Sequence, residues 1–175
     1  MGPRRAGEKE RLACYLASIR YEEIPESVRQ SAWLHILDTI GVMLAGSRLD
    51  AGKRAYALAA SVSENSPAKF SVTLPAAAKK VSLLDGVFAM ATAAHCGEMD
   101  DIHSGAGTCV GGMVVPGALA LAENHPVDGC RFLEAVVAGY ETTVRVGLAI
   151  DAPRLFSAGW WPSTLCGVFG VAAAG

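Results

Sequence analysis

Apolar residues recur every three or four positions along most of this chain, and no stretch of useful length alternates apolar with polar residues. The clearest segment runs from Asp128 to about Ile150 and carries, on one face, Leu133, Val137, Tyr140, Val144 and Leu148. That spacing is the period of an α-helix, and Asp128 suits the N-cap position. Since no alternation or fixed repeat competes with it, the pattern predicts an all-α fold.

The same reasoning places the other expected helices at residues 7–19, 25–46, 51–62, 76–94, 113–123 and from 163 onward. Pro25 and Pro116 fit the first turns of two of these helices, and Gly46 fits a helix end. Ser163 is a candidate cap for the last one, and Glu141 and Arg145 should pair four residues apart. Between helices we expect a loose basic start over 1–6, a loop over 63–69 and a loop over 151–162.

The composition favours burial. The chain has 175 residues, of which 51% are hydrophobic, and its mean hydropathy is +0.31. That length suits one domain spanning residues 1–175. The longest apolar runs, such as 113–122, stop well short of the roughly 18 to 20 residues of a membrane span, so we expect no membrane insertion.

Charge and cysteine content narrow the partners and the compartment. A net charge of −2 and a pI near 6.1 give no basic field for nucleic acid, which we exclude as a partner. The five cysteines form no CxxC pair, and the N-terminal residues do not have the charged-then-apolar pattern of a signal peptide. These features favour free thiols and a cytoplasmic location. The chain stops at 171–175 within a helical pattern, which we interpret as a truncation.

Most of the reactive side chains gather in one segment, AAHCGEMDDIHSGAGTCVGGMVVP, at residues 93–116. Positions 95–109 hold two histidines, three carboxylates and two cysteines. Carboxylates crowded into apolar surroundings have pKa values shifted toward neutrality, which suits general acids and bases. The glycines of this segment would let the backbone approach a small ligand, with NH groups directed at an anion where the next helix begins.

Plainer interpretations remain open for each of these residues. Asp100 and Asp101 could cap or solvate a loop, and His95 could cap a helix end. Cys109 could be a small buried hydrophobe, or a nucleophile with His103 as its base. A metal site is a further alternative, although HxxE followed by DDxH matches no strong ligand spacing. Trp160 and Trp161 are most simply core or interface anchors.

Five phrases, in order, resemble the 2-methylcitrate dehydratase (MmgE/PrpD) family. They are YEEIPESVRQSAWLHILDTIGVMLAGS, AAHCGEMDDIH, VVPGALALAE, GYETTVRVG and GWWPSTLCGVFGVAAAG. The similarity extends from about residue 10 to the C-terminus. It implies a helical main domain, which in complete members continues beyond this sequence and is followed by a smaller lid domain that is absent here. It also implies a homodimer.

Members of that family act on small di- and tricarboxylates without a metal or an organic cofactor. Their reactions include dehydration of 2-methylcitrate, decarboxylation of cis-aconitate and epimerisation of iminodisuccinate. Each moves a proton next to a carboxylate, which needs a base and groups that hold the developing charge. The resemblance therefore implies a lyase or isomerase with no cofactor. Arg145, or residues beyond position 175, could supply cations for the substrate.

The resemblance assigns site residues position by position. Glu98 stands where the family commonly has an aspartate, Asp100 and Asp101 match its paired aspartates, and His103 matches the histidine after them. Cys109, preceded by Thr108, stands where the family's catalytic histidine is usual, and Trp161 stands at the histidine of a "GFH" block. These changes indicate a divergent member. We expect as catalytic residues Glu98, Asp101, His103 and Cys109, and as substrate-binding residues His95, Asp100, Thr108 and Trp161.

Three hypotheses follow. The first is an enzyme, or a fragment of one, that moves a proton in a small carboxylic acid. The family's catalytic lysine and a further histidine fall beyond this sequence, so a missing segment or a partner chain would have to supply them. The second is a catalytically silent helical subunit that binds a partner. The third is a metal-dependent hydrolase built on His95, Glu98 and His103.

Overall fold

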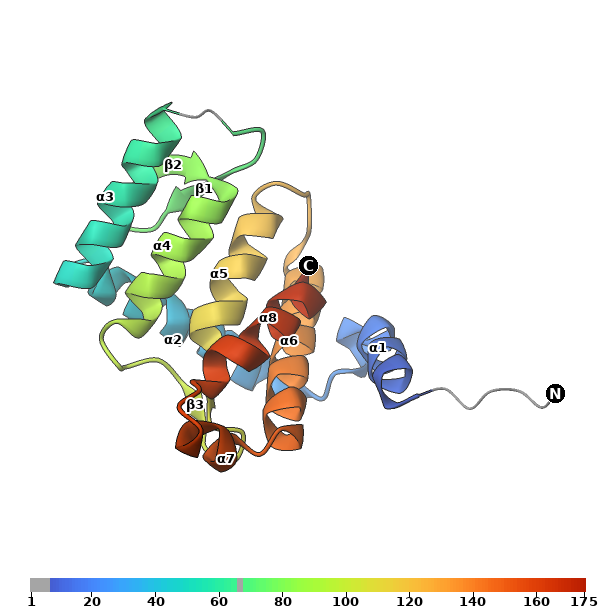
Figure 1. Cartoon of the computed structure of the whole chain (residues 1–175). Helices are drawn as coiled ribbons and strands as arrows, with labels where there is room; N and C mark the ends of the chain where they lie inside the picture. Colours follow the sequence, from blue (N-terminus) through green and yellow to red (C-terminus); the bar gives the residue numbers. More distant parts are fainter. Residues whose placement is uncertain (1–6, 66–67) are drawn as a thin grey trace.

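The structure is a computed structural model that describes residues 7–65 and 68–175, and most of these residues are helical (Figure 1). The loose basic start expected over residues 1–6 lies outside them. The fold-class prediction is confirmed. The helices are α1 (Glu8–Ser18), the short 3-10 helix η1 (Tyr21–Glu23), α2 (Glu26–Gly46), α3 (Asp50–Asn65), α4 (Leu83–His95), α5 (Gly111–Ala122), α6 (Gly129–Ala149), α7 (Ala152–Ser157) and α8 (Pro162–Ala174).

Two small antiparallel hairpins, which the sequence did not reveal, complete the fold. The first pairs β1 (Ser71–Leu74) with β2 (Lys79–Ser82), and the second pairs β3 (Ile102–His103) with β4 (Thr108–Cys109). The helix expected from residue 76 begins only at Leu83. Alanine and leucine suggested helix there, but Ala76 and Ala78 adopt positive φ angles in the hairpin turn.

Packing explains why the first hairpin forms. Val72, Leu74 and Val81 turn inward and are buried against α4. Gly86 of α4 allows this contact, because a β-carbon there would lie 2.1 Å from Cγ1 of Val72. Burial of strand residues on one face therefore outweighs the helical propensity of the alanine-rich turn.

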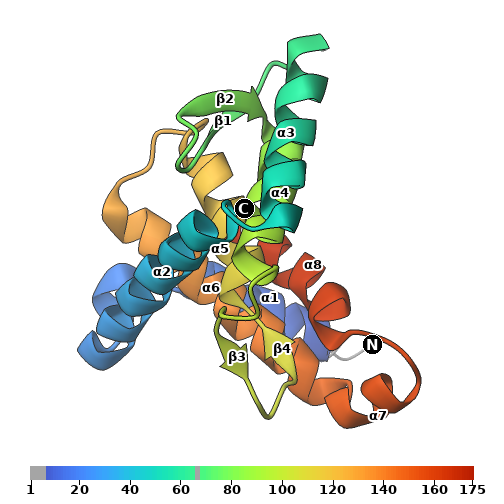
Figure 2. The ribbon, with the colours of Figure 1, turned by 90° about the vertical axis from the view of Figure 1, so that its left-hand side faces the viewer.

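Helix α5 lies between α4 and α6 (Figure 2). Helices α2 and α5 both contribute to two apolar cores. One core, around Met43 and Met90, lies between α2, α3, α4 and the β1–β2 hairpin. The other, around Val114 and Leu133, lies between α2, α5 and α6. The first core contacts α5 near its C-terminal end, at Ala120, and the second contacts its N-terminal half, at Val114.

The helix ends agree with the sequence in some places and differ in others. Asp128 caps α6 as expected by accepting the Arg131 N–H at 2.9 Å, and Arg145 pairs with Glu141 at 2.7 Å. Ser163 does not cap α8, which begins one residue earlier with Trp161 at its N-cap. Helix α5 begins at Gly111, so Pro116 lies inside the helix rather than in its first turn. Helix α7 occupies part of the loop expected at 151–162.

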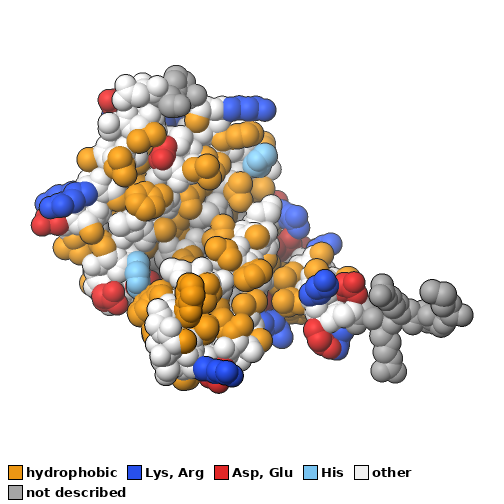
Figure 3. Space-filling model, in the orientation of Figure 1, with side chains coloured by type: hydrophobic (Ala, Val, Ile, Leu, Met, Phe, Trp, Pro, Cys, Tyr) orange, Lys and Arg blue, Asp and Glu red, His pale blue; other side chains and the backbone are white. Residues whose placement is uncertain are grey.

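Many apolar side chains stay exposed, and Figure 3 shows them spread over the face seen in Figure 1. Leu84 and Phe88 project from α4, and Val168 and Phe169 project from α8. Among the described residues, none of the helices combines the length and apolarity that crossing a bilayer would require.

Candidate functional site

A cavity of about 640 Å³ opens where α4 ends, where α5 and α8 begin, and beside strand β4. Its volume is in the range typical of small-molecule sites. The residues that line it are Ala91, Thr92, His95, Cys96, Glu98, Asp100, Cys109, Gly112, Met113, Trp161, Ser163 and Thr164. Segments distant in sequence thus meet around one hollow, and five of the expected site residues are among them.

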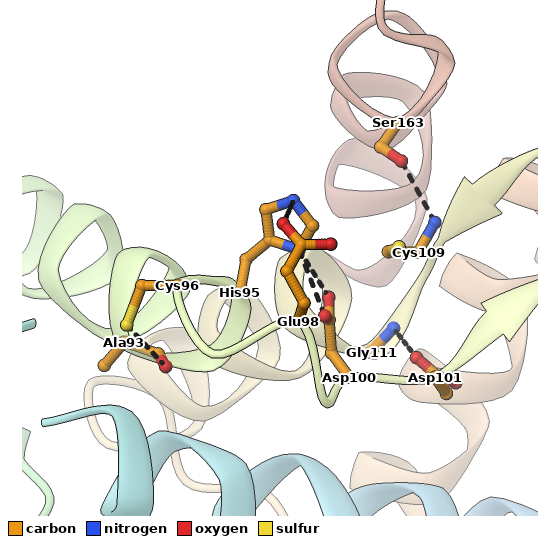
Figure 4. Close-up of polar contacts among 9 residues, drawn as sticks. All are labelled: Ala93, His95, Cys96, Glu98, Asp100, Asp101, Cys109, Gly111 and Ser163. Carbon is orange, nitrogen blue, oxygen red and sulfur yellow. Dashed lines mark hydrogen bonds and ion pairs between the residues drawn. The ribbon is translucent and has the colours of Figure 1, made fainter. Parts of the chain in front are cut away.

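His95 and Asp100 form the central pair of this cavity (Figure 4). Nδ1 of His95 lies 3.0 Å from both carboxylate oxygens of Asp100, whose side chain is only 3% exposed. An ionised carboxylate can only accept, so Nδ1 carries the proton and Nε2 keeps its lone pair. A buried carboxylate therefore orients an imidazole whose second nitrogen is free to take a proton.

The start of α5 makes room for the Asp100 carboxylate. Gly112 lines the cavity, and a β-carbon there would lie 3.0 Å from Oδ2 of Asp100. The N-terminal end of a helix carries partial positive charge, which stabilises a nearby anion. The Gly111 N–H, one of the NH groups expected to face the site, instead donates to Oδ1 of Asp101 at 2.7 Å.

Glu98 lies at the rim of the cavity. Its side chain is 77% exposed, and its Oε1 lies 3.9 Å from Nε2 of His95. The residue adopts a positive φ of 50° in the turn after α4. This conformation is uncommon for a residue with a side chain, and here it places the carboxylate beside the imidazole.

Cys109 and Trp161 form the wall opposite α4. The Cys109 N–H donates to Oγ of Ser163 at 3.0 Å, which ties β4 to α8. Burial, followed by the negative charge of Asp100, raises the pKa of the Cys109 thiol to about 11. The Trp161 ring lies 6.0 Å from that of His95 and packs edge-on against Phe156. At neutral pH this wall presents a neutral thiol and an indole.

Asp101 points away from the cavity. The two adjacent aspartates have different partners: Asp101 contacts residues of α2, α5 and α6, whereas Asp100 contacts His95 of α4. Its oxygens accept the Gly111 N–H at 2.7 Å and the Tyr140 hydroxyl at 2.9 Å, and Nδ1 of His35 lies at 3.0 Å. Burial and the Asp101 charge together raise the pKa of Tyr140 far above its usual value.

His103 and Thr108 also lie outside the lining of the cavity. His103 is exposed at the β3–β4 turn, where its Nδ1 accepts the Ala106 N–H at 3.0 Å. Thr108 is fully buried, and its hydroxyl has no hydrogen-bond partner within the described chain. Of the expected group of Glu98, Asp101 and His103, only Glu98 borders this cavity.

Two further expectations, for Arg145 and for a hydrolase site, do not agree with the positions of the residues. Arg145 bonds to Glu141 and stacks over Tyr15, so it supplies no cation to the cavity. The hydrolase set of His95, Glu98 and His103 is not assembled, because His103 lies on the second hairpin. The donor atoms that do converge belong to His95, Asp100 and Cys109, and they lie within 4.8 Å of one another.

Sequence reasoning missed two participants. His35 reaches Asp101 from α2, and Ser163 reaches the backbone of Cys109 from α8. Each contact joins segments more than fifty positions apart. Neither residue stands in a motif of its own, so no local pattern could have indicated these contacts.

Comparison with known proteins identifies the family. Residues 10–175 match the MmgE/PrpD N-terminal domain. The chain belongs to the MmgE/PrpD family. Among curated proteins, a cis-aconitate decarboxylase-like protein, oryM of Aspergillus oryzae, is 30% identical over 177 aligned positions. That alignment includes 93% of this chain and 34% of the relative, so the chain spans about a third of the relative's length. Membership in MmgE/PrpD places the chain broadly in a family of dehydratases and lyases.

Proposed function

We propose that this chain forms part of a lyase or isomerase that moves a proton next to a carboxylate in a small di- or tricarboxylic acid. The observation that carries the proposal is the His95–Asp100 pair at 3.0 Å, which opens into a ligand-sized cavity. Family membership and the decarboxylase-like relative support the reaction class.

In this mechanism Nε2 of His95 removes the proton from the carbon next to the carboxylate. Asp100 stabilises the imidazolium that forms, because a buried anion bonded to Nδ1 gains energy when the ring becomes charged. Glu98, beside Nε2, can accept the proton or return it. The neutral Cys109 thiol and the Trp161 ring shape the wall against which the substrate lies.

Stabilising the substrate anion requires cations, and the described residues that line the cavity include no lysine or arginine. The α5 N-terminus supplies only partial charge. We propose that further positive groups come from residues outside this sequence or from a partner chain, a homodimer being the expected form. The five free cysteines favour work in a reducing compartment such as the cytoplasm.

The test is exchange of substrate hydrogen with solvent deuterium, followed by NMR. The protein encoded by the complete gene is incubated with 2-methylcitrate or cis-aconitate, alongside the 175-residue chain. We expect His95→Gln to slow exchange by about 10² to 10⁴, the usual contribution of a general base. Asp100→Asn should act in the same direction, whereas His103→Gln, outside the cavity, should change exchange less than twofold. Full exchange by His95→Gln would refute the proposed base.

A second candidate function is a catalytically silent helical subunit. The exposed apolar residues of α4 and α8 favour it, since such surface is typical of contact sites. Under this alternative the chain binds a partner through that surface and shows no thermal shift with di- or tricarboxylates. A carboxylate-dependent shift that disappears in His95→Gln would favour the enzyme.

A further inference from the structure

We propose that His95, Asp100 and Cys109 form a binding site for a divalent transition-metal ion of the zinc type. Their nitrogen, oxygen and sulfur donors lie within 4.8 Å of one another on the wall of the cavity. The proposal concerns ion binding alone and does not rest on the function proposed above.

The spacing of the donors is close to what such an ion requires. Zinc binds nitrogen and oxygen at about 2.0–2.1 Å and sulfur at about 2.3 Å, so tetrahedral neighbours lie roughly 3.3–3.7 Å apart. Nδ1 of His95 and the Asp100 oxygens already lie 3.0 Å apart. At the 4.8 Å limit of the cluster, the Cys109 sulfur would need to approach by about 1 to 1.5 Å, a movement that side-chain rotation can supply.

The charge of the cavity favours a cation. Two carboxylates, those of Glu98 and Asp100, border it, and its described lining contains no lysine or arginine. An anionic ligand alone would therefore be repelled by the described lining, whereas a divalent ion would be attracted. This observation is independent of the donor spacing.

Neighbouring groups can hold the ligands in place. With Nδ1 bound to the ion, His95 carries its proton on Nε2, which lies 3.9 Å from Oε1 of Glu98. A carboxylate that accepts the other ring N–H is the usual support of a metal-bound histidine. On the other wall, the bond between the Cys109 N–H and Ser163 fixes the strand that carries the thiol.

The mixture of donors predicts which ion binds. Thiolate and imidazole select zinc, cobalt and iron over magnesium and calcium. Three protein ligands would leave a fourth position that faces the cavity, as in catalytic zinc sites. On binding, the Cys109 thiol releases its proton to solvent, so affinity should rise with pH. Nδ1 coordination leaves Nε2 protonated, so an occupied site excludes proton removal by His95.

The experiment is a cobalt titration of the 175-residue chain, stripped of metal by a chelator and kept reduced. The exposed Cys14 and Cys130 are first replaced by serine, so that they contribute no signal. We expect one equivalent of Co²⁺ to produce a thiolate-to-cobalt charge-transfer absorption in the near ultraviolet. One equivalent of Zn²⁺ should abolish it, and Mg²⁺ should not.

Substitutions of the proposed ligands distinguish ion binding at this site from ion binding elsewhere on the chain. Cys109→Ser should remove the charge-transfer band, and Asp100→Asn should weaken binding by about tenfold or more. Cys96→Ser is the matched control, because Cys96 also lines the cavity but its sulfur lies 3.6 Å from two backbone oxygens outside the cluster. Circular dichroism confirms that each variant is helical. If the folded chain gives no band, or if Asp100→Asn leaves the affinity unchanged, the proposal is overturned.

Discussion

We predict that Asp101 stabilises the fold beside the cavity by joining the start of α5 to α6, and replacing it by alanine tests this prediction. Its carboxylate accepts the Gly111 N–H at 2.7 Å and the Tyr140 hydroxyl at 2.9 Å. The first bond anchors the start of α5, and the second anchors the middle of α6. Asp101→Ala would leave the buried Gly111 N–H and the half-buried Tyr140 hydroxyl without this acceptor.

The cost can be worked from these contacts. A buried donor that loses its partner costs about 1–3 kcal/mol, and bonds to a charged group lie in the upper half of that range. The buried Gly111 N–H, at about 2–3 kcal/mol, and the half-buried Tyr140 hydroxyl, discounted to about 1–2 kcal/mol, together give a loss of about 3–5 kcal/mol in the free energy of unfolding. Tyr140→Phe removes one donor together with its bond and should cost about 1 kcal/mol.

The assay is urea unfolding followed by circular dichroism, arranged as a double-mutant cycle. The double variant Asp101→Ala/Tyr140→Phe should lose about 1–2 kcal/mol less unfolding free energy than the sum of the two single variants, because it no longer carries a hydroxyl without an acceptor. Asp38→Ala, at an exposed aspartate of α2, is the control and should change stability by less than about 0.5 kcal/mol. A loss below about 1 kcal/mol for Asp101→Ala would contradict this reasoning.

Further predictions concern the thiol of Cys109 and two helical glycines. The pKa of Cys109 is raised from 9.0 to about 11, so the folded chain keeps a proton that the unfolded chain loses. The resulting contribution to the free energy of unfolding is fully present below pH 9 and is lost as the pH rises to 11. Between these pH values the unfolding free energy, measured with urea, should therefore fall by about 2 kcal/mol less in Cys109→Ser than in the unchanged chain. Gly86→Ala should destabilise the fold by about 1–2 kcal/mol in the same assay, because its new methyl meets Val72 at 2.1 Å. Gly41→Ala, with no atom within 4 Å of its β-carbon, should instead stabilise α2 by up to about 1 kcal/mol.

Helical periodicity predicted the long helices well because it reports directly on which face is buried. Asp128 and the Glu141–Arg145 pair were recognised because capping and i,i+4 contacts are local. The β1–β2 hairpin was missed because its stability comes from contact with Gly86, which follows it in sequence. The alanine-rich turn has helical propensity, and it forms a hairpin because the flanking Val72 and Val81 pack against α4 at Gly86.

The sequence predicted which segment holds the candidate site residues, but it did not predict where their side chains point. The sequence concentrated the reactive residues at 95–109, and His95, Glu98, Asp100 and Cys109 do surround one cavity. It could not separate Asp100 from Asp101, because adjacent aspartates look alike until the backbone conformation decides which way each points. It could not place His103 either, since its exposure follows from the two-residue strand that carries it.

The family resemblance puts histidines where this chain has Cys109 and Trp161, and the structure shows what these residues do to the cavity. Both line it, and with His95 they leave a single imidazole among the described lining residues. Since a buried thiol with a pKa of about 11 is a poor base at neutral pH, the proposed mechanism assigns proton removal to His95. The same thiol is a strong ligand for soft metal ions once it loses its proton. The absence of imidazoles from this wall therefore leaves His95 as the imidazole of the proposed acid–base mechanism, and it provides the sulfur donor on which the proposed ion site depends.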